Sequence, residues 1–241
     1  MKDVSYYYDN ISAEGGYVAI DDVRKVVVVA FSWLMWPQNI AELMVAPHMN
    51  YPKVPGAKVH SGAYMLYRRI RDKFISMIMD KTRRYPAYDL EVIGWSLGGM
   101  MACYMAADLY DNNIIHPKKL YLITLGPPAP GNIRFADYYS NAGFLIKSLV
   151  NANDFWYHLF SLRNGRKHFS PAIYTDKTGI TIQCKDSGDP RCSGTLPPFR
   201  GDPEDHMTYY GLEGTKDTCA GIWMDKLLMA LDNLWAPILN C

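Results

Sequence analysis

The most constraining feature of the sequence is the run "VVVVAF" at residues 26–31, which is apolar at every position. A strand with one solvated face alternates apolar and polar side chains, whereas a strand buried on both faces is apolar throughout. Residues 16–31 hold two such β-rich runs on either side of the polar turn "DDVRK". They are therefore predicted to form a hairpin whose second strand lies inside a sheet that is covered on both faces.

The rest of the chain alternates helix-like and strand-like segments. Apolar spacing predicts helices at 64–84, 97–110 and 135–143, and strands at 89–94, 119–125 and 144–151. This order predicts an α/β fold with a mainly parallel central sheet flanked by helices. A further helix is predicted at 219–235, where five apolar residues recur at helical spacing: Ile222, Leu227, Leu228, Leu231 and Leu234. The length of 241 residues fits a single domain, 1–241.

Composition excludes several classes of protein. The chain has 25 basic and 24 acidic residues, and a formal charge of +1 gives no electrostatic reason to expect nucleic acid as a partner. No apolar run reaches the roughly 20 residues of a transmembrane helix. No His/Cys cluster has the spacing of a zinc site, so no metal is expected. The first residues, "MKDVSYYYDN", lack the apolar core of a signal peptide.

The cysteines suggest one disulfide. Cys184 and Cys192 flank "KDSGDPR", a turn-rich segment that is able to fold back and bring the two sulfur atoms together, and we predict that they pair. Cys219 and Cys241 bracket the C-terminal segment and could also pair, whereas Cys103 lies among apolar helix residues and is expected to be a buried free thiol. A disulfide in a small loop favours secretion.

The stretch "GWSLGG" at residues 94–99 lies between a predicted strand and a predicted helix. A nucleophilic serine on such a tight turn needs small residues two positions before and after it, which Gly94 and Gly98 supply, and Gly99 allows close packing of the helix. The helix that follows directs its free N–H groups towards the reaction centre. Ser96 is therefore predicted to be a nucleophile rather than part of an inert turn.

A serine nucleophile needs a base, and the base needs an orienting acid. In the α/β-hydrolase order the acid and then the histidine follow the serine. The last histidine of the chain, His206 in the polar loop "PEDHMTYYG", is therefore predicted to be the base. Asp154 ends the buried strand "FLIKSLVN" and its loop, at the sheet edge where α/β sites gather, and is predicted to be the acid. Asp176 is the runner-up, and Asp205, next to the histidine, is expected to contact backbone instead.

At these residues the chain resembles the class 3 lipases, the fungal triacylglycerol lipase-like family of α/β-hydrolases. The blocks that carry the resemblance run in order from about residue 16 to 211: "GYVAIDDVRKVVVVAF", "KVHSGAYMLY", "RRYPAYDLEVIGWSLGG", "LITLGPPAPGNIRFA", "VNANDFW" and "DHMTYYG". The resemblance implies the same triad, Ser96, Asp154 and His206. It also implies an oxyanion hole with one donor at the N–H of Leu97 and a second at Leu34, with Trp33 and Ser32 as alternatives.

Some positions depart from the family pattern. Trp95 stands where the family usually has His, and is expected to pack beside the serine without abolishing catalysis. Tyr157 stands where a Pro usually follows the acid. The oxyanion loop reads "FSWL" in place of F-R-G-[ST]. The family's N-terminal helix has no counterpart in the sequence, and the helix at 219–235 is expected to cover the surface on which that helix packs.

Residues 33–47, "WLMWPQNIAELMVAP", correspond to the family's lid over the serine. The predicted lid residues are large and apolar: Trp33, Leu34, Met35, Trp36, Leu43, Met44 and Val45. The alternative is that they pack in the core. An apolar surface segment at the mouth of a site is typical of an interaction site, which suggests activation at a lipid–water interface.

The expected activity is hydrolysis of carboxylic esters, most simply of acylglycerols, through an acyl-enzyme and without a cofactor or metal. The expected partner is a lipid or ester substrate. Within the enzymes, a feruloyl or other soluble-ester esterase and a phospholipase A1 are alternatives. A hydrolase-like binding protein without catalysis is the alternative from another class, because the oxyanion loop and Trp95 depart from the family pattern.

Overall fold

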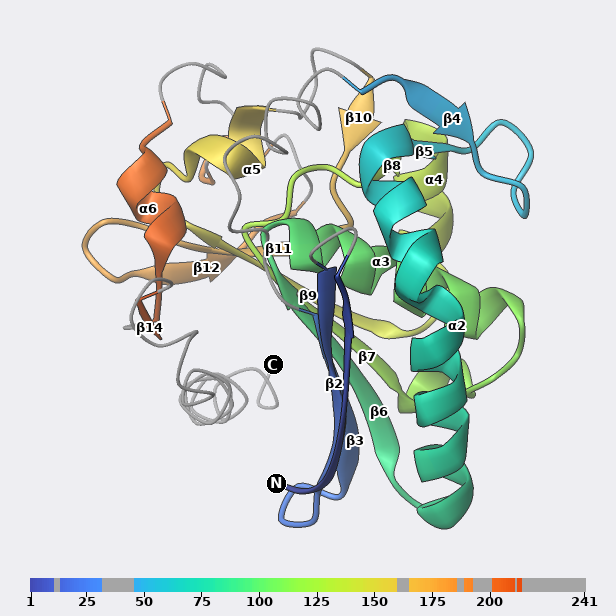
Figure 1. Cartoon of the computed structure of the whole chain (residues 1–241). Coiled ribbons are helices and arrows are strands. Elements are labelled where there is room, and N and C mark those ends of the chain that lie inside the picture. Colours follow the sequence, from blue (N-terminus) through green and yellow to red (C-terminus); the bar gives the residue numbers. More distant parts are fainter. Residues whose placement is uncertain are drawn as a thin grey trace.

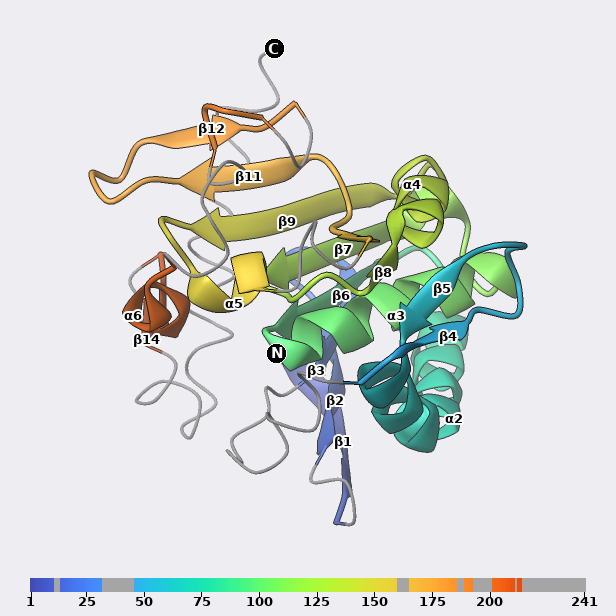
Figure 2. The same ribbon diagram turned by 90° about the horizontal axis from the view of Figure 1, so that it is seen from above.

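The computed structural model describes residues 1–10, 14–31, 46–159, 165–185, 189–192, 201–210 and 212–213. Its main sheet has eight strands in the order β1-β2-β3-β6-β7-β9-β11-β12. Their bounds are β1 (Lys2–Asp9), β2 (Glu14–Asp21), β3 (Val26–Phe31), β6 (Asp89–Trp95), β7 (Leu120–Leu125), β9 (Leu145–Asn151), β11 (Ala172–Thr175) and β12 (Thr181–Gln183). Figure 2 shows β1 and β12 at opposite ends of this sheet.

The five inner strands, β3, β6, β7, β9 and β11, pair in parallel, whereas β1, β2 and β12 pair antiparallel at the two ends. This arrangement confirms the predicted α/β class and the hairpin of β2 and β3. The run "VVVVAF" of β3 is buried at every position, as an inner strand covered on both faces requires.

Two long helices, α2 (Ser61–Arg84) and α3 (Leu97–Asp111), pack on the same face of the sheet (Figure 1). The shorter helices are η1 (Pro117–Lys119), α4 (Ile133–Ser140), α5 (Phe155–Leu159) and α6 (Pro203–Met207). A second sheet has the order β10-β8-β5-β4, with β10 (Arg166–Lys167), β8 (Gly131–Asn132), β5 (Lys58–His60) and β4 (His48–Asn50). The strands β13 (Thr208–Tyr209) and β14 (Leu212–Glu213) pair only with each other in the described chain.

The helix predicted at 64–84 begins earlier in the structure, at Ser61, because of its cap. The Nδ1 atom of His60 accepts a hydrogen bond from the N–H of Ala63 at 3.3 Å, which satisfies one of the unpaired groups of the first turn. Its last turn carries Lys81, Arg83 and Arg84, which suit the negative end of the helix dipole.

Strand β1 was missed by the sequence analysis. Its residues alternate weakly, and Tyr6 and Tyr8 are exposed at the sheet end. Its position is fixed by tertiary contacts: the ring of Tyr7 packs edge-on against Phe74 of α2, and the buried Lys81 pairs with Asp3 at 3.1 Å. Aromatic residues favour strands, but β1 is defined by its antiparallel pairing with β2 together with these contacts to α2.

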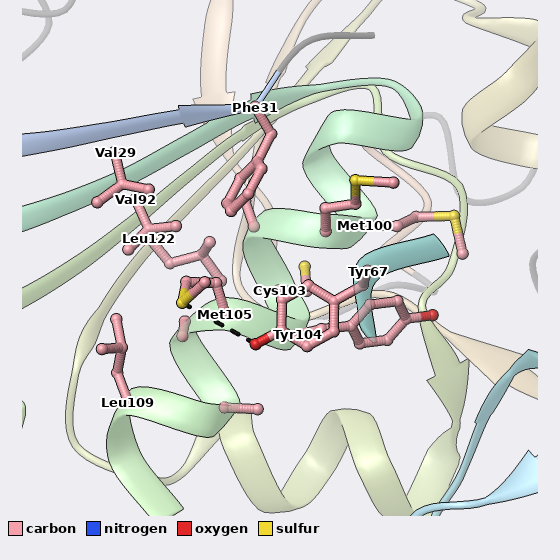
Figure 3. Packing of buried hydrophobic residues seen from close by; sticks show 14 of the residues in the cluster. Val29, Phe31, Tyr67, Val92, Met100, Cys103, Tyr104, Met105, Leu109 and Leu122 are labelled. Carbon is pink, nitrogen blue, oxygen red and sulfur yellow. Dashed lines mark hydrogen bonds between the residues drawn. The ribbon is translucent and has the colours of Figure 1, made fainter. Parts of the chain in front are cut away.

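The main core lies between the sheet and the helices α2 and α3. Figure 3 shows Val29, Val92 and Leu122 from three adjacent strands facing Cys103 and Met105 of α3. All five are at most 1% exposed, and α3 packs against both the sheet and α2. Cys103 is a buried free thiol, as predicted, and its burial raises the pKa of the thiol.

A second, smaller apolar cluster lies on the opposite face of the sheet. It contains Val28, Ile93, Trp95 and Ile123 from the strands and Tyr209 of β13. The ring of Tyr209 thus packs the segment after α6 against Trp95, the last residue of β6.

The predicted disulfide is present. Cys184 and Cys192 are bonded, with their Cα atoms 6.2 Å apart. Asp189 organises the loop between them: its carboxylate accepts hydrogen bonds from the side chain of Arg191 and from the N–H of Lys185, and these bonds lower its pKa.

Several predictions fall on residues that the structure does not describe. Residues 33–45 of the predicted lid, the helix at 219–235, and the pair Cys219 and Cys241 lie outside the described residues, as do the oxyanion candidates Ser32, Trp33 and Leu34. In the described part of the chain, no helix is long and apolar enough to cross a membrane.

Candidate active site

Ser96 lies directly between β6 and α3, as predicted. Its backbone has φ 55° and ψ −124°, a strained conformation for a residue with a side chain, of the kind found where a nucleophile sits on a sharp turn. Its N–H donates to the carbonyl of Leu125 at 2.9 Å. A Cβ atom at Gly94 would lie 2.1 Å from the carbonyl oxygen of Gly98, so the turn closes only with glycine at position 94.

The parallel register brings the other site segments to the same sheet edge. Trp95 pairs with Leu125 and Leu125 pairs with Leu149, so β6, β7 and β9 end side by side. The loops after these three strands begin at Ser96, Gly126 and Ala152 respectively. Side chains that are far apart in sequence therefore meet at the carboxyl ends of the strands.

The three residues predicted to form the triad lie within hydrogen-bond distance of one another. His206 Nε2 is 2.9 Å from Ser96 Oγ, and His206 Nδ1 is 2.8 Å from Asp154 Oδ2. With an ionised Asp154 as acceptor, Nδ1 carries the proton and Nε2 accepts from the serine hydroxyl. The side chains of Asp154 and His206 are 0% and 2% exposed, so water competes little for either bond.

Asp154 is buried, and four donors compensate for the loss of water around its carboxylate. Oδ1 accepts from the N–H groups of Trp156 and Tyr157 at 2.9 and 3.1 Å. Oδ2 accepts from Nδ1 of His206 and from the Tyr209 hydroxyl at 2.5 Å. Burial, together with the charge of Asp154, raises the pKa of Tyr209, so that its hydroxyl stays protonated and acts as a donor.

Gly126 is a site residue that the sequence analysis missed. It has φ 51°, and a Cβ atom there would lie 2.3 Å from Asp154 Oδ2, 2.4 Å from the Tyr209 hydroxyl and 3.1 Å from His206 Nδ1. The absent side chain leaves the space in which acid, base and tyrosine meet. The signals in the sequence are its place directly after the predicted strand 119–125 and within the block "LITLGPPAPGNIRFA", which resembles the family.

The alternative acids have other partners. Asp205 Oδ2 accepts from the N–H of Asn153 at 2.9 Å, which is the backbone contact expected of it. Asp176 Oδ1 accepts three hydrogen bonds from Thr178 and Ile180 within its own turn. Neither carboxylate is bonded to His206 in the described chain.

Leu97 is the first residue of α3, so its N–H has no acceptor within the helix. It directly follows Ser96, where the positive end of the helix dipole favours a developing oxyanion. The N–H of Leu97 therefore stays the predicted first oxyanion donor. No group of three or more His, Cys, Asp or Glu side chains that could hold a metal ion occurs among the described residues.

Two buried histidines lie behind Asp154. The ring of His168 stacks on Tyr157 at 3.7 Å between ring centroids, and the ring of His158 packs edge-on against Tyr157 at 5.3 Å. Burial, with a smaller effect of His158, lowers the pKa of His168 to about 3. In the unfolded chain a histidine has a pKa of about 6.5.

This difference predicts acid sensitivity. Below about pH 6.5 the histidine is protonated in the unfolded chain but stays neutral in the folded protein. The contribution of His168 to the free energy of unfolding is therefore retained above that pH. As the pH falls towards 3, the free energy of unfolding decreases by about 1.4 kcal/mol per pH unit. Between pH 6.5 and 5 the free energy of unfolding in urea is expected to fall by about 1.6 kcal/mol less for His168→Phe, which keeps a stacking ring, than for the wild type. The exposed His116, replaced by Asn, is the control, and equal losses in wild type and His168→Phe would contradict the prediction.

The mostly parallel sheet, the strained serine turn and the Ser–His–Asp arrangement define an α/β-hydrolase. The model of the family described as "Lipase (class 3)" matches residues 30–163, and the chain belongs to this family. The resemblance read from the sequence blocks is thereby confirmed.

Individual relatives give the same assignment. A lipase of Rhizomucor miehei is 32% identical over 200 residues, which cover 81% of this chain and 54% of that protein. A secreted mono- and diacylglycerol lipase A of Penicillium cyclopium is 28% identical over 217 residues, which cover 86% of this chain and 70% of the relative. A solved triacylglycerol lipase, whose catalytic centre is described as a serine protease triad, superposes with a TM-score of 0.80 at 29% identity, covering 87% of this chain and 80% of that one. The chain spans about half the length of the curated lipases from Rhizomucor and Rhizopus that it matches.

Proposed function

We propose that this protein is a serine carboxylic-ester hydrolase that cleaves acylglycerols. The observation that carries the proposal is the continuous hydrogen-bonded chain from Ser96 Oγ through His206 to the buried Asp154 at the end of the parallel strands. Relatives named as lipases, one of them described with a serine protease triad, support the choice of substrate class.

The geometry fits acyl transfer to and from serine. Ser96 Oγ attacks the ester carbonyl while His206 Nε2 takes its proton, and the imidazolium then donates that proton to the leaving alcohol. Asp154 fixes the tautomer through Nδ1 and stabilises the imidazolium. The N–H of Leu97 binds the oxyanion, and water hydrolyses the acyl-enzyme with His206 again acting as the base.

Reaction with a fluorophosphonate probe tests whether the protein is an enzyme, because only an activated serine is phosphonylated. Labelling and fatty-acid release from glycerides are expected together. An unlabelled, inactive wild-type protein would favour a binding protein with a hydrolase fold. A screen of triacylglycerols, phospholipids and feruloyl esters then separates the lipase from a phospholipase A1 or a soluble-ester esterase.

We also propose that the substrate is taken from a lipid–water interface. The support is the apolar composition of the predicted lid, residues 33–47, which lies mostly outside the described residues. Transfer of one or two Trp side chains into lipid would contribute roughly 2–5 kcal/mol, enough to reverse a closed-to-open preference of similar size.

Activity on a short-chain glyceride is therefore expected to jump when the concentration passes the solubility limit. Trp36→Ser should reduce this jump more than it reduces hydrolysis of a dissolved ester. Initial rates measured across the limit decide the matter: a smooth saturation curve would argue for a soluble-ester esterase instead.

We propose that the protein acts outside the cell. The Cys184–Cys192 disulfide and the secreted relative from Penicillium support this location. Intact-mass measurement with and without reductant, after alkylation, checks the oxidation state of the native protein, and five alkylated thiols without reductant would contradict it.

A further inference from the structure

The segment that carries His206 does not belong to the main sheet. It consists of the short helix α6 and strand β13, which pairs only with β14 in the described chain. The backbone of this segment is tied to the loop after β9 at its beginning, where the N–H of Asp202 donates to the carbonyl of Asn153 at 2.7 Å. Beyond that point the loop after β9 and the side chains at two strand ends hold the segment.

Side-chain N–H groups from two strand ends hold the backbone of this segment around the histidine. Asn151 Nδ2, at the end of β9, donates to the carbonyls of Asp205 and Thr208 at 3.0 and 2.7 Å. Trp95 Nε1, at the end of β6, donates to the carbonyl of His206 itself at 3.2 Å. Asn151 thus binds the chain on both sides of His206, and Trp95 binds the carbonyl of His206, whose imidazole has to reach both Ser96 and Asp154.

Trp95 makes this contact in a fully enclosed place. Its side chain is 1% exposed, and its ring packs edge-on against Tyr209 at 5.7 Å between centroids. A buried indole N–H requires an acceptor, and here the acceptor belongs to the base of the site. Because Trp95 directly precedes Ser96, one strand end holds both the nucleophile and the backbone of the histidine.

We propose that Trp95 is a positioning residue, which holds His206 in register with Ser96 through the bond from its indole N–H to the His206 carbonyl. This inference rests on the proposed hydrolase function and deepens it. The class 3 pattern usually has His at this position, so the larger indole of Trp95 departs from that pattern. A shift of the imidazole by about 1 Å is sufficient to cost on the order of 100-fold in rate.

Trp95→Phe keeps an aromatic ring but removes the donor. The expected result, per active site titrated with a fluorophosphonate, is a kcat lower by about 10-fold with KM unchanged, since the bond serves the transition state and does not touch substrate. The acid limb of the kcat/KM profile should move to lower pH, because a displaced His206 is held less well by Asp154 as imidazolium. The far-downfield proton resonance of the Nδ1–H bond to Asp154 should shift or broaden.

Replacement of Trp95 by 3-benzothienylalanine provides a sharper variant if Trp95→Phe folds poorly, because sulfur takes the place of the indole N–H in a ring of nearly the same shape. Tyr138→Phe is the control, as Tyr138 is a partly exposed ring on α4, away from the site. The same fall in kcat and shift of the profile are expected for the benzothienyl variant, and neither for the control.

A lower melting temperature with unchanged kcat and pH profile would overturn the inference, since that result describes packing alone. A raised KM with unchanged kcat would also overturn it, because Trp95 would then act on substrate. These failures differ from failure of the proposed function, in which the wild-type protein itself neither hydrolyses esters nor reacts with the fluorophosphonate.

Discussion

Ser96→Ala is expected to lower ester hydrolysis by about 10⁴-fold or more while the protein remains folded. The substitution removes the only hydroxyl within hydrogen-bond distance of His206 Nε2 in the described chain, at 2.9 Å, which is the atom proposed to form the acyl-enzyme. The loss to folding is one hydrogen bond, about 1 kcal/mol. Hydrolysis of a p-nitrophenyl ester, labelling by a fluorophosphonate and thermal unfolding are the three measurements.

Activity and labelling should disappear together, with a melting temperature close to that of the wild type. A variant that hydrolyses the ester at an unchanged rate would refute the assignment of Ser96. If the variant does not fold, peptide mapping of the labelled wild-type protein identifies the serine that reacts. A label on any residue other than Ser96 would also refute the assignment.

Gly126→Ala is expected to lower kcat by about 100-fold or more, although the position carries no chemistry. The new Cβ would lie 2.3 Å from Asp154 Oδ2 and 2.4 Å from the Tyr209 hydroxyl, well inside contact distance, so the acid or the tyrosine has to move. Either movement disturbs the bond from Asp154 to His206. Steady-state kinetics per titrated active site measure the effect.

Gly179→Ala is a matched control. Gly179 also has a positive φ, 87°, but a Cβ atom there would have no heavy atom within 4 Å. Both substitutions introduce the backbone strain of a side chain at positive φ, about 1 kcal/mol. Only Gly126→Ala adds the collision, so similar activities of the two variants would show that the space beside Asp154 is not required.

Much of the fold was predictable because its information is local. The continuous apolar run of β3, the helical spacing of α2 and α3, and the strand–turn–helix around Ser96 are written in neighbouring residues. Chain order and strand ends also selected Asp154 and His206, since parallel strands bring their carboxyl ends to a common edge. The same reasoning explains why the Cys184–Cys192 bridge was predictable: the two cysteines flank a short turn-rich loop.

The remaining features depend on contacts between distant segments. Tyr209 lies within the block "DHMTYYG", but its bond to Asp154 joins β13 to the loop after β9, and the sequence assigns it no role. Strand β1 is held by partners on α2, and the bond from Trp95 to the carbonyl of His206 spans more than a hundred positions. The need for glycine at position 126 comes from three side chains that approach from other elements. Local patterns predict which residues form each element and which supply the reactive groups. Packing in three dimensions determines which atoms come into contact, and only that packing fixes the positions of the acid and the base.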